Sequence, residues 1–129
     1  MRRLDVLPGT FAVCRLAPAA AVPAWAERGS LLAVTRTPDE LSIVCEASRV
    51  PADVRAEGPW RAIRVAGTLD FALAGVLRDV LEPLAEAGIS VFAISTFDTD
   101  YVLVRADRFG ESAMALRGAG YVVQGDSRG

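Results

Sequence analysis

The chain has 129 residues, of which 52% are hydrophobic and 23% are charged, so it is a globular chain with enough apolar material for a buried core. Its formal charge of −2 gives no electrostatic reason to expect nucleic acid or an anionic membrane as a partner. It has no histidine, and all 14 basic residues are arginine, which excludes histidine general-base chemistry, a Schiff-base lysine and a P-loop lysine.

The first half of the chain predicts strands and little helix. Residues 1–9 read as a lead-in that ends at the Pro8-Gly9 turn signal. Strands are predicted where β-branched and apolar residues gather, with a helical turn after a proline and a tight turn between the last two strands. The expected elements are strands at 10–16, 31–36 and 41–46, the helical turn at 23–26, the tight turn at 37–40 and a loop at 47–59.

The second half reads β-α-β-β-α-β. After Asp70 the hydrophobic period changes from 2 to 3.6, which predicts a helix over about 71–87 with one apolar stripe. Asp70 or, failing that, Thr68 is the expected N-cap, and Pro83 should bend the last turn. The other expected elements are strands at 60–66, 90–97, 101–105 and 121–123, a helix at about 108–117 capped by Asp107 with Phe109, Ala113 and Leu116 inward, and a polar tail from Gln124.

This element order predicts an α+β protein containing a ferredoxin-like βαββαβ unit, with both helices on one face of its sheet. The first half reads as a truncated version of the same unit, and the two units are expected to pack together. We therefore expect a truncated half at 1–58, a complete unit at 59–124 and a disordered tail at 125–129.

The two cysteines and the membrane signals concern the environment of the protein. Cys14 and Cys45 lie within apolar runs and do not form a CxxC pair, so we expect buried free thiols. A disulfide between them would require neighbouring strands. No apolar run approaches the length of a bilayer span and the N-terminus lacks an apolar signal core, so the expected location is the cytoplasm, with no membrane partner.

Two segments carry candidate binding chemistry. The turn at Gly67-Thr68-Leu69-Asp70-Phe71 leads into a helix, whose free N–H groups suit a carboxylate; an ordinary turn with an aspartate cap is the alternative. The hairpin tip offers the hydroxyl of Thr96 and the carboxylate of Asp100, which could pair with an ammonium or guanidinium; solvated turn residues are the alternative.

Together the two segments predict a site for a zwitterion. We expect the strand at 60–66 and the strand at 90–97 to be neighbours in the sheet, so that helix-start amides and hairpin-tip oxygens converge. A free amino acid carries a carboxylate and an ammonium group a few ångströms apart, so it needs hydrogen-bond donors for the first and acceptor oxygens for the second. The carboxylates of Asp98 and Asp100 do not make a metal site without further ligands that converge on the same point. No metal or cofactor is therefore expected.

Three stretches also carry a family resemblance. The run Ile94-Ser95-Thr96-Phe97-Asp98-Thr99-Asp100-Tyr101-Val102-Leu103-Val104, with Gly67 to Phe71 and Pro83 to Ile89, resembles small tandem-ACT proteins. These are bacterial relatives of the arginine-sensing CASTOR proteins and of the regulatory domains of aspartate kinases. The resemblance is specific from Trp60 to Val123 and weaker over residues 1–59.

The resemblance implies a ligand between two ACT units, against the first helix and the Ser-Thr-Phe strand. It implies that Asp100 is the acidic partner of a cationic group and that the first half supplies the opposing wall, for which residues 31–35 are the candidate. The ligand contacts that it implies are Leu69, Asp70, Phe71, Gly75, Thr96, Phe97 and Asp100. Gly75 lies off the apolar stripe, where either a close approach to a ligand or packing against a strand would explain it.

We therefore expect a stand-alone regulatory or sensor protein that binds a free amino acid. The resemblance also allows a homodimer, and the output would pass through a downstream protein whose identity cannot be read from the sequence. The alternative is an ACT-type oligomerisation or protein-interaction module that binds no ligand. An enzyme is not expected, because no nucleophile–base pair or metal cluster is visible.

Overall fold

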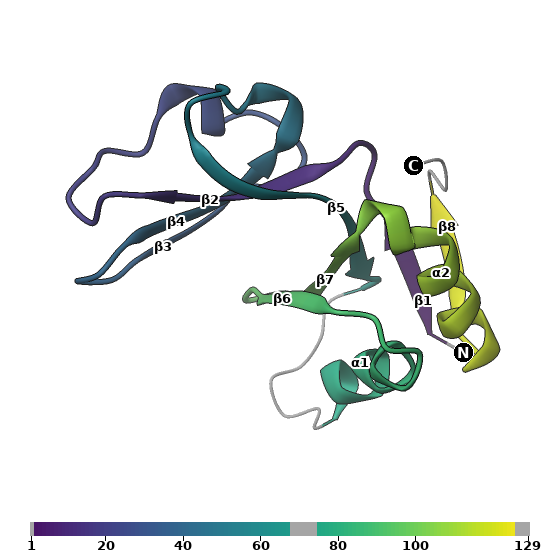
Figure 1. Ribbon diagram of the computed structural model, residues 1–129. Coiled ribbons are helices and arrows are strands. Elements are labelled where there is room, and N and C mark those ends of the chain that lie inside the picture. The colour runs from purple at the N-terminus through teal and green to yellow at the C-terminus, as the bar shows by residue number, and fades with distance from the viewer. Residues whose placement is uncertain (1, 68–74, 126–129) are drawn as a thin grey trace. The chain divides into compact units, whose positions relative to one another are not determined.

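The computed structural model describes residues 2–67 and 75–125 of the chain, which divides into two compact units (Figure 1). Unit 1 takes Met1–Pro8 and Arg61–Gly129, and unit 2 takes Gly9–Trp60. This division differs from the expected 1–58 half, because the first eight residues belong with the second half of the chain. Strand β5, Arg55–Val65, contributes its first part to unit 2 and its last part to unit 1.

The sheet of unit 1 has five strands in the order β6-β7-β5-β1-β8. β6 and β7 form an antiparallel hairpin, and β1 runs antiparallel to β5 and parallel to β8. The bounds of these strands are β1 Arg3–Val6, β6 Val91–Ser95, β7 Asp100–Arg105 and β8 Val122–Gly125. The βαββαβ order predicted for the second half is therefore present, with one additional strand from the N-terminus.

The prediction that residues 1–9 form a lead-in is wrong, because they contain β1. Leu4 lies opposite Val65 of β5 on one side and Val123 of β8 on the other. Leu4 and Val6 are buried, whereas Arg3 and Asp5 form an ion pair that is partly exposed. This alternation is that of a half-buried strand, but it spans four residues only, too few to predict a strand.

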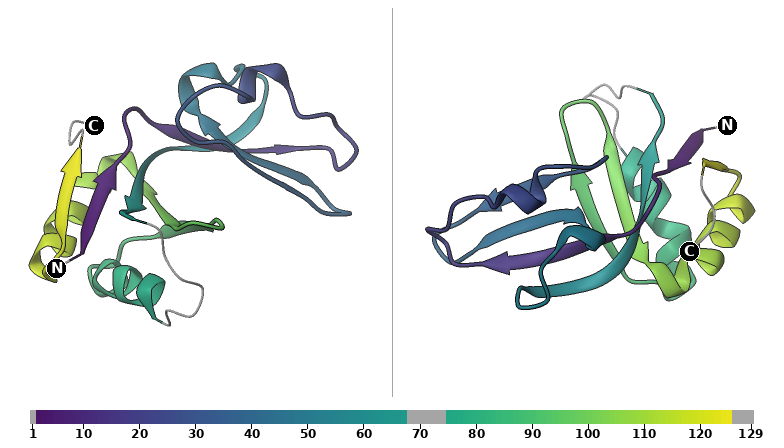
Figure 2. Two further views of the ribbon diagram at one scale, coloured as in Figure 1. Left: turned by 180° about the vertical axis from the view of Figure 1, so that it is seen from behind. Right: turned by 90° about the horizontal axis from the view of Figure 1, so that it is seen from above.

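Helices α1, Val76–Glu86, and α2, Phe109–Gly118, cover the same face of the unit 1 sheet (Figures 1 and 2). They contact each other and close a single core with the strands. The inward positions expected on the second helix are confirmed, since all three are buried. The core comprises Leu4, Val6, Ile63, Val65, Val80, Leu84, Ile89, Val102, Val104, Phe109, Ala113, Leu116 and Val123.

The helix starts differ from the predictions. The two N-caps expected for the first helix, Thr68 and Asp70, lie outside the described residues, and α1 begins at Val76. Asp107 does not cap α2. It lies inside the 3-10 turn η3, Ala106–Arg108, which runs directly into the helix, so Arg108 holds the cap position without a side-chain cap bond.

The prediction that the first and second strands of the βαββαβ unit are neighbours is also wrong. β5 and β6 each pair with β7, which lies between them. The reason is burial. Three consecutive residues of β7, Val102 to Val104, are fully buried, whereas β6 alternates between exposed and half-buried positions. The more apolar strand of the hairpin takes the inner position and the other becomes the sheet edge.

At the C-terminus the last strand is longer than expected. Gln124 and Gly125, assigned to the polar tail, pair with Asp5 and Val6 of β1. The remaining tail residues lie outside the described chain. Within the part that the structure describes, no helix is both long and apolar enough to cross a membrane.

Unit 2 is a sheet in the order β3-β4-β2-β5, covered by short 3-10 turns and no α-helix. The strand and turn bounds are β2 Phe11–Leu16, η1 Ala24–Ala26, β3 Ala33–Arg36, β4 Leu41–Glu46 and η2 Ala47–Arg49. The expected loop at 47–59 is therefore partly wrong, because β5 begins at Arg55. Residues 55–57 have weak strand propensity, and their pairing with β2 overrides it.

The two cysteines lie in unit 2 on neighbouring strands, Cys14 on β2 and Cys45 on β4. Both are free and buried, as predicted. Burial raises the pKa of the Cys14 thiol, and burial together with the nearby Cys14 raises the pKa of Cys45 to about 12. Both thiols therefore stay protonated and unreactive at neutral pH.

This shift predicts a loss of stability in alkali. The ordinary cysteine pKa is 9.0, so the unfolded chain loses the Cys45 proton first as the pH rises. The free energy of unfolding should then fall from about pH 9 towards pH 12, by at most about 1.4 kcal/mol per pH unit for one thiol. Urea unfolding at pH 7.5, 9 and 10 measures this fall. Cys45→Ala should show a shallower dependence, and equal slopes for the two proteins would contradict it.

The position of β1 predicts a second effect on stability. Leu4→Ala opens a cavity between β5 and β8 and should lower the free energy of unfolding by about 2–5 kcal/mol. Arg3→Ala, on the next residue, removes a partly exposed ion pair and should cost less than about 1 kcal/mol. Urea unfolding of both variants checks the difference, and similar losses would argue that β1 is not part of the core.

Candidate functional site

The hairpin between β6 and β7 ends in a turn that Thr96 closes. The Thr96 backbone N–H donates to the Thr99 carbonyl at 2.8 Å, and the Thr96 hydroxyl donates to the same oxygen at 3.0 Å. The Thr99 N–H in turn donates to the Thr96 hydroxyl oxygen at 3.2 Å. Phe97 at the apex is 80% exposed. Thr96 therefore has a structural role in the turn, and its role as a ligand contact stays a prediction.

Thr99 ties this turn to the neighbouring strand. Its side chain is buried, and its hydroxyl donates to the Val65 carbonyl, at the end of β5, at 2.7 Å. No local pattern predicts this bond, because its partner lies 34 residues away. The bond brings the hairpin tip to the point where β5 ends.

Asp100 is the half-buried carboxylate of the tip. Its Oδ1 accepts a hydrogen bond from the Ser95 hydroxyl at 2.6 Å. Side chains alternate along a strand, so Asp100 lies on the same face of β7 as Val102 and Val104, the face that the helices cover. The tip therefore presents a negative charge beside the end of β5.

The other predicted segment is described only at its two ends. Gly67, at the end of β5, has a φ of 85°. Gly75 is the N-cap of α1 with a φ of 81°, a left-handed conformation that favours glycine, and a Cβ there would meet the Arg78 guanidinium at 3.2 Å. Backbone conformation thus explains Gly75. Leu69, Asp70 and Phe71 lie outside the described residues. These three residues and Gly75 remain predicted contacts.

A hollow of about 500 Å³ lies beside the end of β5. Two arginines from the start of the chain, Arg2 and Arg3, line it together with Ala66 and Gly67. The Ala66 N–H donates to the Arg3 carbonyl at 3.0 Å, which fixes the two segments side by side. Nothing in the sequence predicted that these arginines would reach this point, because their segment was expected as a lead-in.

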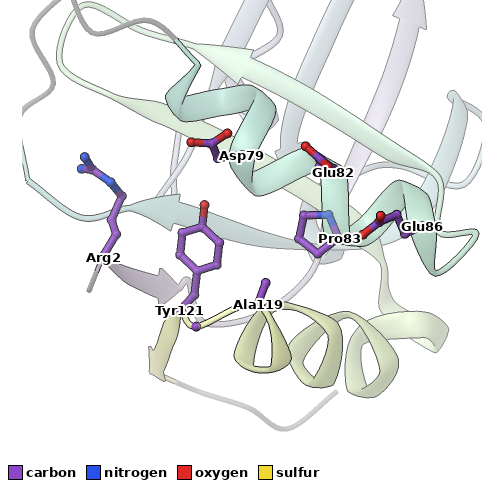
Figure 3. A pocket seen from close by; sticks show the side chains of 8 residues that line it. Arg2, Asp79, Glu82, Pro83, Glu86, Ala119 and Tyr121 are labelled. Carbon is purple, nitrogen blue, oxygen red and sulfur yellow. The ribbon is translucent and has the colours of Figure 1, made fainter.

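A second hollow, of about 510 Å³, lies between α1 and the segment that follows α2 (Figure 3). Three carboxylates of α1, on Asp79, Glu82 and Glu86, line it opposite Tyr121. Burial and the charge of Asp79 raise the pKa of the Tyr121 phenol, against an opposing effect of Arg2. Among the described residues no group of three acidic or cysteine side chains is placed to hold a metal ion.

Sequence reasoning also missed a buried cation. Arg61 in β5 is completely buried, and its guanidinium lies over the Phe109 ring, 4.6 Å from the centroid. The strand alternation of β5 offered a signal, since Arg61 shares its face with the core residues Ile63 and Val65. This contact joins β5 to the start of α2 and stabilises the sheet–helix interface.

Comparisons with known proteins match both halves of the chain. The family model for the ACT domain matches residues 55–118, and a model that describes an N-terminal domain matches residues 9–53. A protein of Agobacterium tumefaciens with a crystal structure is 38% identical, over 97% of this chain and 93% of its own, with a TM-score of 0.91. The aspartate kinase of Clostridium acetobutylicum shares the fold, with a TM-score of 0.65 at 10% identity, over 90% of this chain and 33% of its own.

Curated relatives include the human cytosolic arginine sensor for mTORC1 subunit 1. It is 36% identical over 85 residues, which are 60% of this chain and 26% of the relative. The bovine protein of the same name matches equally. The chain therefore spans about a quarter of the length of these relatives.

The βαββαβ unit, with both helices on one face of its sheet, is a ferredoxin-like domain, and the family model that matches it is that of the ACT domain. The chain belongs to the ACT-domain family. It is similar in sequence to the CASTOR-type arginine sensor over 85 residues, and it shares its fold with aspartate kinase. The resemblance stated from the sequence is thus confirmed, as is the α+β ferredoxin-like fold.

The Thr99 bond gives a prediction for stability. Thr99→Val removes the hydroxyl and leaves the Val65 carbonyl without its buried donor, so the free energy of unfolding should fall by about 1–3 kcal/mol. Thr99→Ser keeps the donor and should lose less. Chemical denaturation of both variants measures the difference. A Thr99→Val protein as stable as the wild type would mean that the bond does not hold the tip.

Proposed function

We propose that this protein is a regulatory sensor that binds a free amino acid at the end of β5. The observation that carries the proposal is the bond from Thr99 to the Val65 carbonyl, which sets the hairpin tip beside the end of that strand. The tip contributes the charge of Asp100, and the strand leads towards the helix start. Opposite fields for an ammonium group and a carboxylate are thereby available within unit 1.

Asp100 is the proposed partner of the cationic group of the ligand. Its carboxylate is half-buried, so water screens it less than a fully exposed one. The Ser95 hydroxyl occupies Oδ1 and orients the group. A charge-assisted hydrogen bond from an ammonium or guanidinium to this carboxylate is the strongest contact that the tip can offer.

The relatives support an amino acid as the class of ligand. The human relative is named as an arginine sensor, and the Clostridium neighbour is an aspartate kinase. The proposal names a free amino acid as the class of ligand, because one carboxylate serves an α-ammonium and a basic side chain alike. The ligand position between the halves, the contacts of Leu69, Asp70, Phe71 and Gly75, and a downstream partner remain predictions.

One feature favours the alternative, an interaction module without a ligand. β6 is an edge strand that, in the described chain, pairs with β7 alone. Its five residues, Val91 to Ser95, carry no charge, and Phe97 beyond it is largely exposed. Uncharged edges readily accept another strand, so this edge suits pairing with a second chain.

A thermal-shift screen of the twenty amino acids separates the two functions. A ligand that binds only the folded state raises the melting temperature with concentration, as mass action requires. At 100 times its Kd the stabilisation is about 2.7 kcal/mol. A saturable rise for one or a few amino acids supports the sensor. Flat melting curves for all twenty, with self-association by light scattering, would support the interaction module.

Asp100→Asn tests the proposed contact. The change keeps an oxygen for the Ser95 hydroxyl but removes the charge, so ligand affinity should fall at least tenfold, or about 1.4 kcal/mol, while unfolding changes by less than about 1 kcal/mol. Asp98→Asn, an equal charge change at the exposed apex, is the matched control and should bind normally. Isothermal titration with an amino acid found in the screen measures both. Equal weakening by the two variants would refute a specific contact.

A further inference from the structure

We infer that Arg2 binds the α-carboxylate of the amino acid held at the end of β5. The inference rests on the proposed function and names the second charged contact of the same site. Arg2 lines the hollow beside Ala66 and Gly67, the last described residues of this strand end. A guanidinium matches a carboxylate with two parallel hydrogen bonds, which makes arginine well suited to this group.

The topology of unit 1 places opposite charges on the two sides of β5. β1 and β7 are its two neighbours in the sheet. β1 is antiparallel to β5, so its start, next to Arg2, meets the end of β5. The start of β7, with Asp100, lies at the same end, because Thr99 is bonded to Val65.

Both charges also lie on the same face of the sheet. Leu4 and Val6 point towards the helices. Arg2 lies two residues before Leu4, so its position is on the same face of the sheet. Asp100 shares the alternation of Val102 in the same way. Figure 3 shows Arg2 on the helix side, near the Tyr121 ring. The influence of Arg2 on the Tyr121 pKa agrees with this position.

Arg2 is available for a ligand, whereas its neighbour is not. The Arg3 guanidinium is bound to Asp5 at 3.0 Å. Across residues 2–67 and 75–125 Arg2 forms no salt bridge, and Asp79, the carboxylate that shares a hollow with it, is bound to Arg78 at 3.1 Å. The Arg2 backbone is nevertheless fixed, because its carbonyl accepts the Val122 N–H at 3.1 Å.

The spacing suits a ligand that lies across the strand end. Adjacent strands are about 4.8 Å apart, so the backbones of β1 and β7 are about 10 Å apart on either side of β5. Arg2 lies on the β1 side of this interval and Asp100 on the β7 side. A zwitterion placed between them directs its carboxylate to Arg2 and its cationic group to Asp100.

The test compares acids with amides. The probes are the twenty L-amino acids and their α-carboxamides, which keep the ammonium and side chain but lose the carboxylate charge. For each amino acid that binds, the wild type should prefer the acid over its amide at least tenfold. Arg2→Gln should lose this preference while binding the amide about as well as the wild type does. Arg2→Lys should recover part of it.

Arg64→Gln is the matched control, because it makes the same charge change next to the end of β5, on the other face of the sheet and outside the residues that line the hollow. It should keep the wild-type ratio of acid to amide affinity. An unchanged ratio in Arg2→Gln would overturn the role of Arg2 while leaving the proposed function intact. A wild type that binds none of the twenty amino acids would overturn both.

Discussion

The unit 1 sheet depends on the burial of Leu4 and Val6. These two side chains hold β1 between β5 and β8. The backbone of β1 forms a hydrogen-bond ladder with β5 on one side and with β8 on the other. Without β1 each of these strands would have an unpaired edge inside the sheet, which is costly for backbone groups that are buried. Four residues at the start of the chain therefore determine whether the sheet that carries the site is continuous.

The candidate site follows from the same arrangement. β5 ends between two neighbours that bring different chemistry to it, an arginine on the β1 side and an aspartate on the β7 side. The hydroxyl of Thr99 holds the start of β7, with Asp100, in place. The hydrogen bond between the Arg2 carbonyl and the Val122 N–H holds the Arg2 backbone. The site is thus supported by regular strands rather than by long loops, which favours a fixed geometry for a small ligand.

Much of this fold could be predicted from the sequence. The period change after Asp70, the apolar hairpin and the β-α-β-β-α-β order predicted an α+β ferredoxin-like unit, because each signal extends over many residues. β1 was missed because its alternation is short, and the first part of β5 because its residues have weak strand propensity. Both segments become strands because they pair with partners that are distant in sequence, and a local sequence pattern does not predict such pairing.

Predictions for the site were less complete for the same reason. The motif at the hairpin tip identified Asp100, but the buried bond of Thr99 and the position of Arg2 depend on contacts between segments far apart in sequence. The supposed adjacency of the first two strands of the unit was wrong, and the tip reaches the end of β5 through β7 instead. Arg61 is the exception, because its spacing from Ile63 and Val65 in the sequence already predicts that it shares their buried face.

The pairing of β1 with β8 has a consequence for the order of events during synthesis. Residues 9–60 form one uninterrupted stretch, so unit 2 has all its strands as soon as that stretch leaves the ribosome. Unit 1 must wait, because its first strand is made before unit 2 and the partner of that strand on one side, β8, is made after unit 2. Until then Leu4 and Val6 stay uncovered on that side, and the nascent chain carries an apolar strand that chaperones or premature partners can bind.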